Sequence, residues 1–176
     1  MAERIFHVSE TAGIARFEPR ADSEGRMRVW TIGESRLHNY LLPRDCPRVT
    51  YFANATTSDA DRRAFFTVSD TQSVVAIEQA WLPTVHTARL HLYEFDPRGF
   101  VLEDAIAAYY VSTRPTTPIA HREIADPLTE LFDRGVELRV LSSLWPLRDA
   151  VVASTLGFSI IRLRNAQPRG ALTAGA

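Results

Sequence analysis

The chain has 176 residues, of which 45% are hydrophobic and 23% are charged, and its formal net charge is -1. These values are typical of one folded domain and exclude the fibrous, disordered and membrane classes of protein, while the near-zero charge excludes a global field that attracts nucleic acid. The single cysteine excludes an internal disulfide and a cysteine-based zinc site within one chain.

The first half of the chain alternates β-rich runs with short helical runs. Three runs rich in β-branched and aromatic residues are expected to form strands, at 4–8, 27–32 and 48–53. Residues 34–42 are expected to form about two helical turns, which end at Pro43 because proline stops a helix. Ser58 and Asp61 have the spacing of a capping box, which predicts that a short helix begins there.

The second half of the chain contains the clearest pattern of a helix. Asp126 is followed by proline, and Gly135 ends the run, so a capped helix is expected between them. Residues 88–96 alternate between apolar and polar side chains, which predicts a strand. Further elements are expected as strands at 73–78, 107–113, 136–141 and 158–165, a helical turn from Gln79, and a helix at 143–154.

Strands outnumber helices, and most intervals between them are too short for repeated βαβ crossovers. The sequence therefore predicts an α+β fold in a single domain, residues 1–166, with a mostly antiparallel, curved or split β-sheet and short helices at its sides. Residues 167–176 are small and contain proline and glycine, so a disordered tail is expected. The start "MAERIF" is not typical of a signal peptide, and we expect a cytoplasmic protein.

The stretch "FHVSE", residues 6–10, is a candidate binding site. If strand alternation holds, Phe6 and Val8 face the core while His7 and Ser9 share the other face. An imidazole and a hydroxyl can hold a ribose, because both groups donate and accept hydrogen bonds. The alternative is a half-exposed histidine on a strand that merely ends in polar residues.

The loop "LLPRDCPRV" has two interpretations. Its prolines could present Arg44 and Arg48 to an anion, or they could stiffen a turn in which Asp45 pairs with an arginine. Cys46 is interpreted as a small core residue. The five histidines have no spacing typical of metal ligands, so no metal is expected, and no glycine-rich dinucleotide fingerprint or GxSxG motif is present.

Over nearly its whole length, the chain resembles an uncharacterised bacterial family, a domain of unknown function. The resemblance rests on "FHVSE...F.PR", "VWTI", "NYLLPRDCPRV", "VVAIEQAW", "LYEF", "YYVSTRPTTP" and the closing "GVELRVLSSLWPLRD...IRLRNA". More distantly, the order of elements resembles the ADP-ribosyltransferase fold. That fold carries a histidine or arginine and a hydroxyl residue on a first strand, an aromatic or hydroxyl residue on a second, and a carboxylate or amide at a later strand end.

This distant resemblance implies an NAD-binding site and assigns residues to it. His7 and Ser9 match the first motif and would hold the ribose and the nicotinamide amide, while Trp30 and Thr31 match the second motif. Trp30 or Tyr40 would form the stacking wall. The third motif is matched by Tyr110, Ser112 and Arg114, which include no carboxylate, and Glu78 is the substitute for it. Four arginines are candidates for the pyrophosphate: Arg16, Arg20, Arg44 and Arg114.

Two hypotheses of function follow from these residues, with a third left open. The first is an NAD- or ADP-ribose-binding protein of ADP-ribosyltransferase type, in which His7 positions the ribose and Glu78 acts electrostatically if transfer occurs. The second is a non-enzymatic binding module for a phosphorylated small molecule or single-stranded RNA, with Trp81, Tyr109 and Trp145 as stacking residues; the near-neutral charge counts against nucleic acid. The third is a partner-binding or homodimeric domain without a small ligand.

Overall fold

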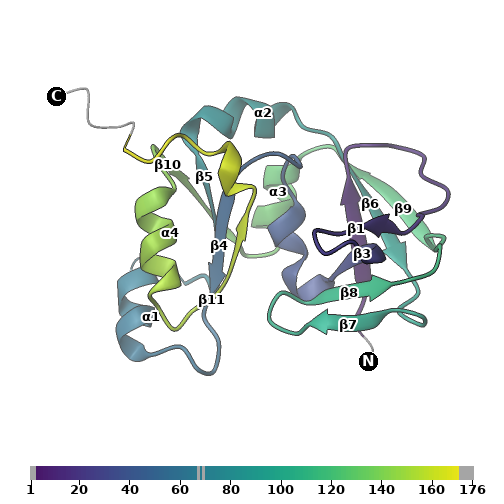
Figure 1. Ribbon diagram of the computed structural model, residues 1–176. Coiled ribbons are helices and arrows are strands. Elements are labelled where there is room, and N and C mark those ends of the chain that lie inside the picture. The colour runs from purple at the N-terminus through teal and green to yellow at the C-terminus, as the bar shows by residue number, and fades with distance from the viewer. Residues whose placement is uncertain (1–2, 67, 69, 171–176) are drawn as a thin grey trace. The chain divides into compact units, whose positions relative to one another are not determined.

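A computed structural model of the protein describes residues 3–66, 68 and 70–170 (Figure 1). The described chain divides into two compact units. Unit 1 is drawn from Met1–Leu41 and Arg89–Ala125, and unit 2 is drawn from Leu42–Ala88 and Asp126–Ala176. Each unit is therefore built from two separate stretches of sequence.

Unit 1 contains a seven-stranded sheet in which every pairing is antiparallel. Six strands lie in the order β7-β8-β3-β1-β6-β9, and β2 pairs with β3. The strands are β1 (Ile5–Ser9), β2 (Arg20–Ala21), β3 (Met27–Gly33), β6 (Leu90–Phe95), β7 (Val101–Asp104), β8 (Tyr109–Ser112) and β9 (Ala120–Ile124). A 3-10 helix, η1 (Glu34–Tyr40), follows β3.

The sheet of unit 1 opens between β1 and β3. All five residues of β1 pair with β6, whereas only Ile5 and Phe6 pair with β3, opposite Gly33 and Ile32. The α+β class and the mostly antiparallel sheet are confirmed.

One face of this sheet carries a hydrophobic cluster that includes Ile5, Phe17, Tyr93 and Phe95. The Tyr93 hydroxyl donates a hydrogen bond to the Thr11 carbonyl (2.8 Å), and Tyr93 also holds the backbone of the loop between β1 and β2 by accepting a second bond. His7 lies on this face, because alternate residues of a strand share a face. The sequence predicts that His7 lies on the face opposite the core. In the structure His7 shares a face with Ile5 of the hydrophobic cluster, and its ring contacts Phe17, so this prediction is wrong.

Unit 2 contains a four-stranded sheet in the order β10-β5-β4-β11, in which β10 is parallel to β5 and the other pairs are antiparallel. Its strands are β4 (Arg48–Phe52), β5 (Ser73–Glu78), β10 (Glu137–Leu141) and β11 (Gly157–Ile161). Its helices are α1 (Asp59–Phe66), η2 (Gln79–Trp81), α2 (Leu82–Thr87), α3 (Pro127–Phe132), α4 (Trp145–Val152) and η3 (Leu163–Asn165).

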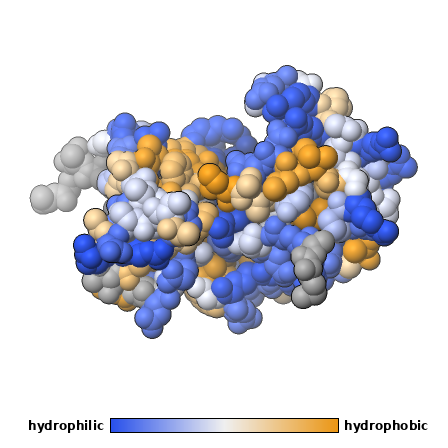
Figure 2. All heavy atoms as spheres, turned by 90° about the horizontal axis from the view of Figure 1, so that it is seen from below, coloured by the Kyte–Doolittle hydropathy of each residue, from blue (hydrophilic) through white to orange (hydrophobic). Residues whose placement is uncertain are grey.

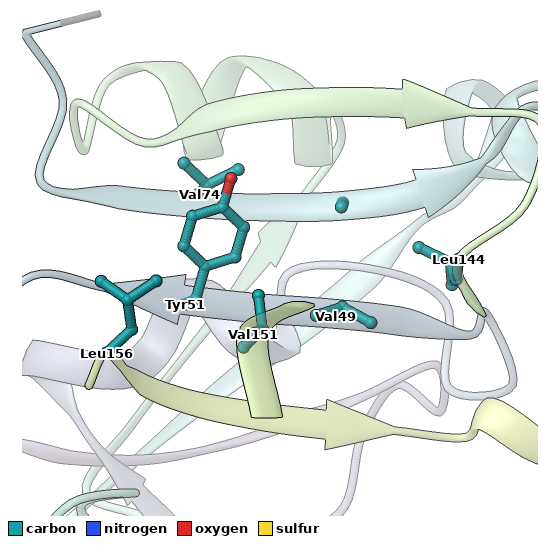
Figure 3. Close-up of a cluster of buried hydrophobic side chains, with 7 residues drawn as sticks. Val49, Tyr51, Val74, Leu144, Val151 and Leu156 are labelled. Carbon is teal, nitrogen blue, oxygen red and sulfur yellow. The ribbon is translucent and has the colours of Figure 1, made fainter. Parts of the chain in front are cut away.

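In the core of unit 2, buried side chains of the sheet meet Val151 of α4 (Figure 3). Tyr51 and Val74 project from neighbouring strands, and Val151 of α4 packs against them. Phe65 and Phe66 of α1 complete the packing around the Tyr51 ring, at centroid distances of 5.5 and 5.7 Å. These contacts bury Val151 of α4 and partly bury Phe65 and Phe66 of α1, and such packing is what stabilises helices of this length.

Several local predictions for unit 2 are confirmed. Asp126 caps α3 by accepting hydrogen bonds from the backbone N–H groups of Leu128 and Thr129. The Ser58 hydroxyl oxygen accepts from the Asp61 N–H at the start of α1, as a capping box requires. The strand that begins at Ser73 gives way to η2 at Gln79, as expected.

The first residues of the expected tail are held in place in unit 2. The Gln167 N–H donates to Glu78, and the Trp145 indole N–H donates to the Gln167 carbonyl (2.7 Å). The Arg169 guanidinium lies over the Trp145 ring, 5.1 Å from its centroid. Gln167 and Arg169 thus have partners in unit 2. The disorder of the tail stays a prediction, and residues 171–176 lie outside the described residues.

The surface carries separate hydrophobic patches between hydrophilic areas when it is seen from below (Figure 2). Among the described residues, the large exposed hydrophobic side chains of unit 1 include Val101, Leu102 and Ile106, in and after edge strand β7. No helix in the described part of the chain is long and apolar enough to cross a membrane.

Candidate functional site

An aromatic platform in unit 1 is the strongest candidate for a functional site. We define it as Trp30 of β3, Tyr109 of β8 and Tyr40 of η1. The Trp30 and Tyr109 rings meet edge to face, with centroids 5.7 Å apart, and the hydroxyl groups of Tyr109 and Tyr40 are 2.6 Å apart. All three side chains are partly exposed. Partly exposed, mutually fixed rings are the kind of surface on which a planar ligand can stack.

A charged group borders the aromatic platform. The Arg28 guanidinium lies over the Trp30 ring, 5.7 Å from its centroid, and forms a salt bridge with Glu103. This cation–π contact fixes the indole and places a positive charge beside it. The salt bridge offsets that charge in part, so Arg28 is not a dedicated anion site.

His7 contacts Trp30 where β1 and β3 part. The His7 Nδ1 atom lies 2.9 Å from the Trp30 carbonyl oxygen. Because a carbonyl oxygen only accepts, Nδ1 must carry the proton, and Nε2 is then the acceptor atom of the neutral ring. The His7 ring also lies 4.9 Å from the Phe17 ring. His7 therefore bridges the two strands beyond their last paired residues.

The side chains of His7 and Trp30 point to opposite faces of the sheet. Ile5 pairs with Gly33, so His7 shares a face with Thr31, and Trp30 faces the other side. The structure thus brings the first two motifs to neighbouring strands but does not place the His7 and Trp30 rings in one pocket. Strand alternation within "VWTI" places Trp30 and Thr31 on opposite faces of the sheet, and this signal could have shown that the Trp30 and His7 rings lie apart.

The remaining residues of the predicted motifs in unit 1 are engaged locally. The Thr31 hydroxyl donates to the Tyr110 carbonyl, and the Ser9 hydroxyl oxygen accepts from the Thr11 N–H. The Ser112 hydroxyl bonds the backbone of Arg114 at the end of β8. The Thr31 hydroxyl thus links β3 to β8, while those of Ser9 and Ser112 stabilise the chain at the ends of their strands.

Sequence reasoning missed a carboxylate beside the third motif. Glu3 accepts hydrogen bonds from the Tyr110 hydroxyl and from both the N–H and the hydroxyl of Ser35. Burial raises the pKa of Glu3, but the hydrogen bonds from Ser35 and Tyr110 outweigh burial, so the pKa lies below its usual value. The carboxylate is ionised at neutral pH and is occupied by structural bonds. No sequence signal singles it out, because it precedes the first strand.

The proposed substitute carboxylate, Glu78, lies in unit 2 and not in unit 1. It ends β5, is almost fully buried, and accepts hydrogen bonds from the Leu144 N–H (3.2 Å) and the Gln167 N–H (2.9 Å). Two backbone donors account for both carboxylate oxygens, which is a structural arrangement. The strand pattern of "SVVAIE" predicts the position of Glu78 at a strand end but not its partners.

The candidate pyrophosphate arginines are distributed over both units. Arg16, Arg20 and Arg114 are exposed in unit 1, and Arg16 pairs with Glu18 at 2.8 Å. Arg44 is exposed in unit 2. The four arginines therefore do not belong to one unit, and unit 1 alone supplies three of them.

The loop "LLPRDCPRV" has the features of the stiffened turn. The buried Arg48 guanidinium donates to the carbonyls of Pro43 (2.9 Å) and Cys46 (3.0 Å), which fixes the loop on itself. Asp45 lies 3.7 Å from Arg162. Burial raises the pKa of the Cys46 thiol to about 11, so this thiol is protonated and unreactive at neutral pH.

The fold and the platform define an α+β protein with one antiparallel sheet, one mixed sheet and a partly exposed aromatic cluster. Residues 6–166 match the model of a family of unknown function, DUF6886, and the chain belongs to this family. The predicted membership of a domain-of-unknown-function family is confirmed. No curated protein and no solved structure matches the chain.

Proposed function

We propose that unit 1 binds a nucleotide of the NAD or ADP-ribose type, with its planar ring on the aromatic platform. The observation that carries the proposal is the fixed geometry of Trp30, Tyr109 and Tyr40, held by an edge-to-face contact and a hydroxyl–hydroxyl contact. A ring stacked on such side chains gains about 1–3 kcal/mol per base.

The position of the platform supports this ligand class. Trp30 and His7 belong to the two motifs that resemble those of ADP-ribosyltransferases, and they lie on adjacent strands where the sheet opens. In the proposal His7 is a positioning residue: its Nδ1–H holds the Trp30 carbonyl (2.9 Å) and so sets the separation of β1 and β3. Ser9 stabilises the end of β1, and Thr31 fixes β3 against β8.

The proposal is one of binding rather than transfer. A transferase needs a carboxylate that stabilises developing positive charge at the ribose. Within unit 1, Glu3 is engaged by Ser35 and Tyr110, and Glu78 belongs to unit 2. The proposal therefore covers binding of the nucleotide and assigns no carboxylate to a transfer step.

Isothermal titration calorimetry with NAD and ADP-ribose tests the proposal. Wild-type protein is expected to bind at least one of the two. Trp30→Ala should weaken that binding by about 10- to 100-fold, which corresponds to the loss of one stacking contact. Trp81→Ala is the matched control, because Trp81 is a partly exposed tryptophan of unit 2 and should not change the affinity.

Two results would contradict the proposal. One is the absence of binding to both nucleotides by folded wild-type protein. The other is an equal loss of affinity in the Trp30 and Trp81 variants. A single-stranded RNA oligomer in the same titration tests the alternative ligand, and its affinity should fall steeply with salt if phosphate contacts dominate.

A further inference from the structure

We infer that His91 of β6 and His121 of β9 form a two-histidine anchor for a divalent transition-metal ion. The His91 Nδ1 atom lies 3.2 Å from the His121 Nε2 atom. Two nitrogen ligands about 2.0–2.1 Å from a tetrahedral zinc ion are about 3.3 Å apart. The two nitrogen atoms are thus already at the separation that one shared ion requires, and without an ion they share one N–H.

The rings are held in position by their neighbours. The His121 ring stacks on the Tyr93 ring, with centroids 4.6 Å apart and an interplanar angle of 22°. Tyr93 is itself buried, and its hydroxyl donates to the Thr11 carbonyl and accepts from the Ile14 N–H. A fixed aromatic support limits the rotamers of His121, and such preorganisation favours metal binding.

The site is open to solvent and lies beside a carboxylate. His121 is exposed on edge strand β9, and His91 is partly exposed. Glu123 pairs with His91 in the register of β6 and β9, so the two side chains share a face, and Glu123 lies 3.7 Å from Arg89. The described residues contain no group of three or more potential ligands, so water or a bound molecule would complete the coordination.

The donor set selects the class of metal. Two imidazole nitrogen atoms favour Zn²⁺, Ni²⁺ and above all Cu²⁺, whereas Mg²⁺ and Ca²⁺ prefer oxygen ligands. The absence of a local histidine spacing in the sequence does not bear on this site, because its two ligands come from different strands, 30 residues apart. The aromatic platform contributes no residue to the site, so this inference does not depend on the proposed nucleotide.

Calorimetric titration of the whole chain with Cu²⁺, Zn²⁺ and Mg²⁺ tests the inference. One equivalent of Cu²⁺ or Zn²⁺ is expected to bind, and Mg²⁺ is not. His91→Gln and His121→Gln should each weaken the binding by at least about tenfold, because loss of even an outer-shell partner typically costs about 10- to 100-fold. His86→Gln is the matched control, because His86 is an exposed histidine of α2 in unit 2 and its loss should leave the affinity unchanged.

Electron paramagnetic resonance of the Cu²⁺ complex gives a second readout. Coupling to two imidazole nitrogen atoms is expected in wild-type protein and in the His86 variant, and coupling to one is expected when His91 or His121 is replaced. Wild-type affinity in the His121→Gln variant would overturn the inference, as would the absence of Cu²⁺ and Zn²⁺ binding by folded wild-type protein. His121 is exposed, so this variant is expected to fold.

Discussion

Removal of the Tyr51 hydroxyl should stabilise the protein. Tyr51 is 1% exposed in the core of unit 2, and its hydroxyl has no hydrogen-bond partner among the described residues. An unsatisfied buried polar group costs about 1–3 kcal/mol, and Tyr51→Phe removes only that group while it keeps the ring contacts with Phe65 and Phe66. We expect a gain near the lower end, about 1 kcal/mol, because a small void remains where the oxygen was.

The matched control is the same chemical change at Tyr93 in unit 1. The Tyr93 hydroxyl donates to the Thr11 carbonyl (2.8 Å) and accepts from the Ile14 N–H (3.1 Å), so Tyr93→Phe leaves two backbone groups without their partner. This change should destabilise the protein by about 1–2 kcal/mol. Two identical substitutions at buried tyrosines are therefore expected to have opposite signs.

Urea denaturation followed by circular dichroism measures both effects, and a change of 1 kcal/mol should also move the melting temperature by about 2–4 °C for a chain of this size. Burial raises the pKa of Tyr51 to about 12 from its usual value of 10. The wild-type chain should therefore lose stability relative to Tyr51→Phe as pH rises from 10 to 12, where the unfolded tyrosine ionises first. A Tyr51→Phe variant that is as unstable as Tyr93→Phe would refute the reasoning.

Three further predictions concern the turns and the ends of helices. Gly135→Ala should lower the free energy of unfolding by about 1–2 kcal/mol in urea denaturation. Gly135 has φ +67° and an added Cβ meets nothing within 4 Å, so the cost comes from the backbone conformation alone, and an unchanged free energy of unfolding would contradict this. Truncation after Ala166 should destabilise the chain by about 1–3 kcal/mol, because the buried Glu78 loses a backbone donor, and an unchanged melting temperature would show that the docked segment contributes nothing. Hydrogen bonds from Thr155 lower the pKa of Asp61 below its usual 3.8, so the stability that they supply is present above pH 3.8 and is lost as the pH falls. The free energy of unfolding of Asp61→Asn should therefore fall less steeply in acid than that of the wild-type chain, and parallel curves would count against the linkage.

Local sequence signals predicted the elements whose stabilising contacts are local. The cap at Asp126, the capping box at Ser58 and the change from strand to helical turn at Gln79 all depend on residues within four positions of one another. The caps at Asp126 and Ser58 satisfy backbone groups at a helix end, which sequence spacing describes directly.

Strands β7 and β9 were not predicted, because neither of these two edge strands has a buried face. Every residue of Val101–Asp104 is exposed, and only Ile124 is buried in Ala120–Ile124, so neither run shows a clear apolar alternation. Pairing with β8 and β6 defines these strands, and pairing between distant segments leaves little trace in local composition. For the same reason the pairing of His91 with His121 could not be expected from sequence.

The candidate site was predicted in part. The first two motifs do lie on adjacent strands, and Trp30 and Tyr40 do belong to one cluster, through Tyr109. The role of Glu78 could not be assessed from sequence, because its partners follow it by 66 and 89 positions. A two-residue period shows which residues share a face, but it cannot show which face a distant loop will cover.

A fluorescence titration with Trp30 as the sole tryptophan tests the proposed function most directly. The chain has three tryptophans, so Trp81→Phe with Trp145→Phe leaves only the indole of the aromatic platform as a reporter. Addition of NAD or ADP-ribose should change the Trp30 emission in a saturable way, with the same dissociation constant as calorimetry gives for the wild-type chain. Saturable nucleotide binding by calorimetry with no change in Trp30 emission would contradict the account, because the ligand would then bind away from the platform.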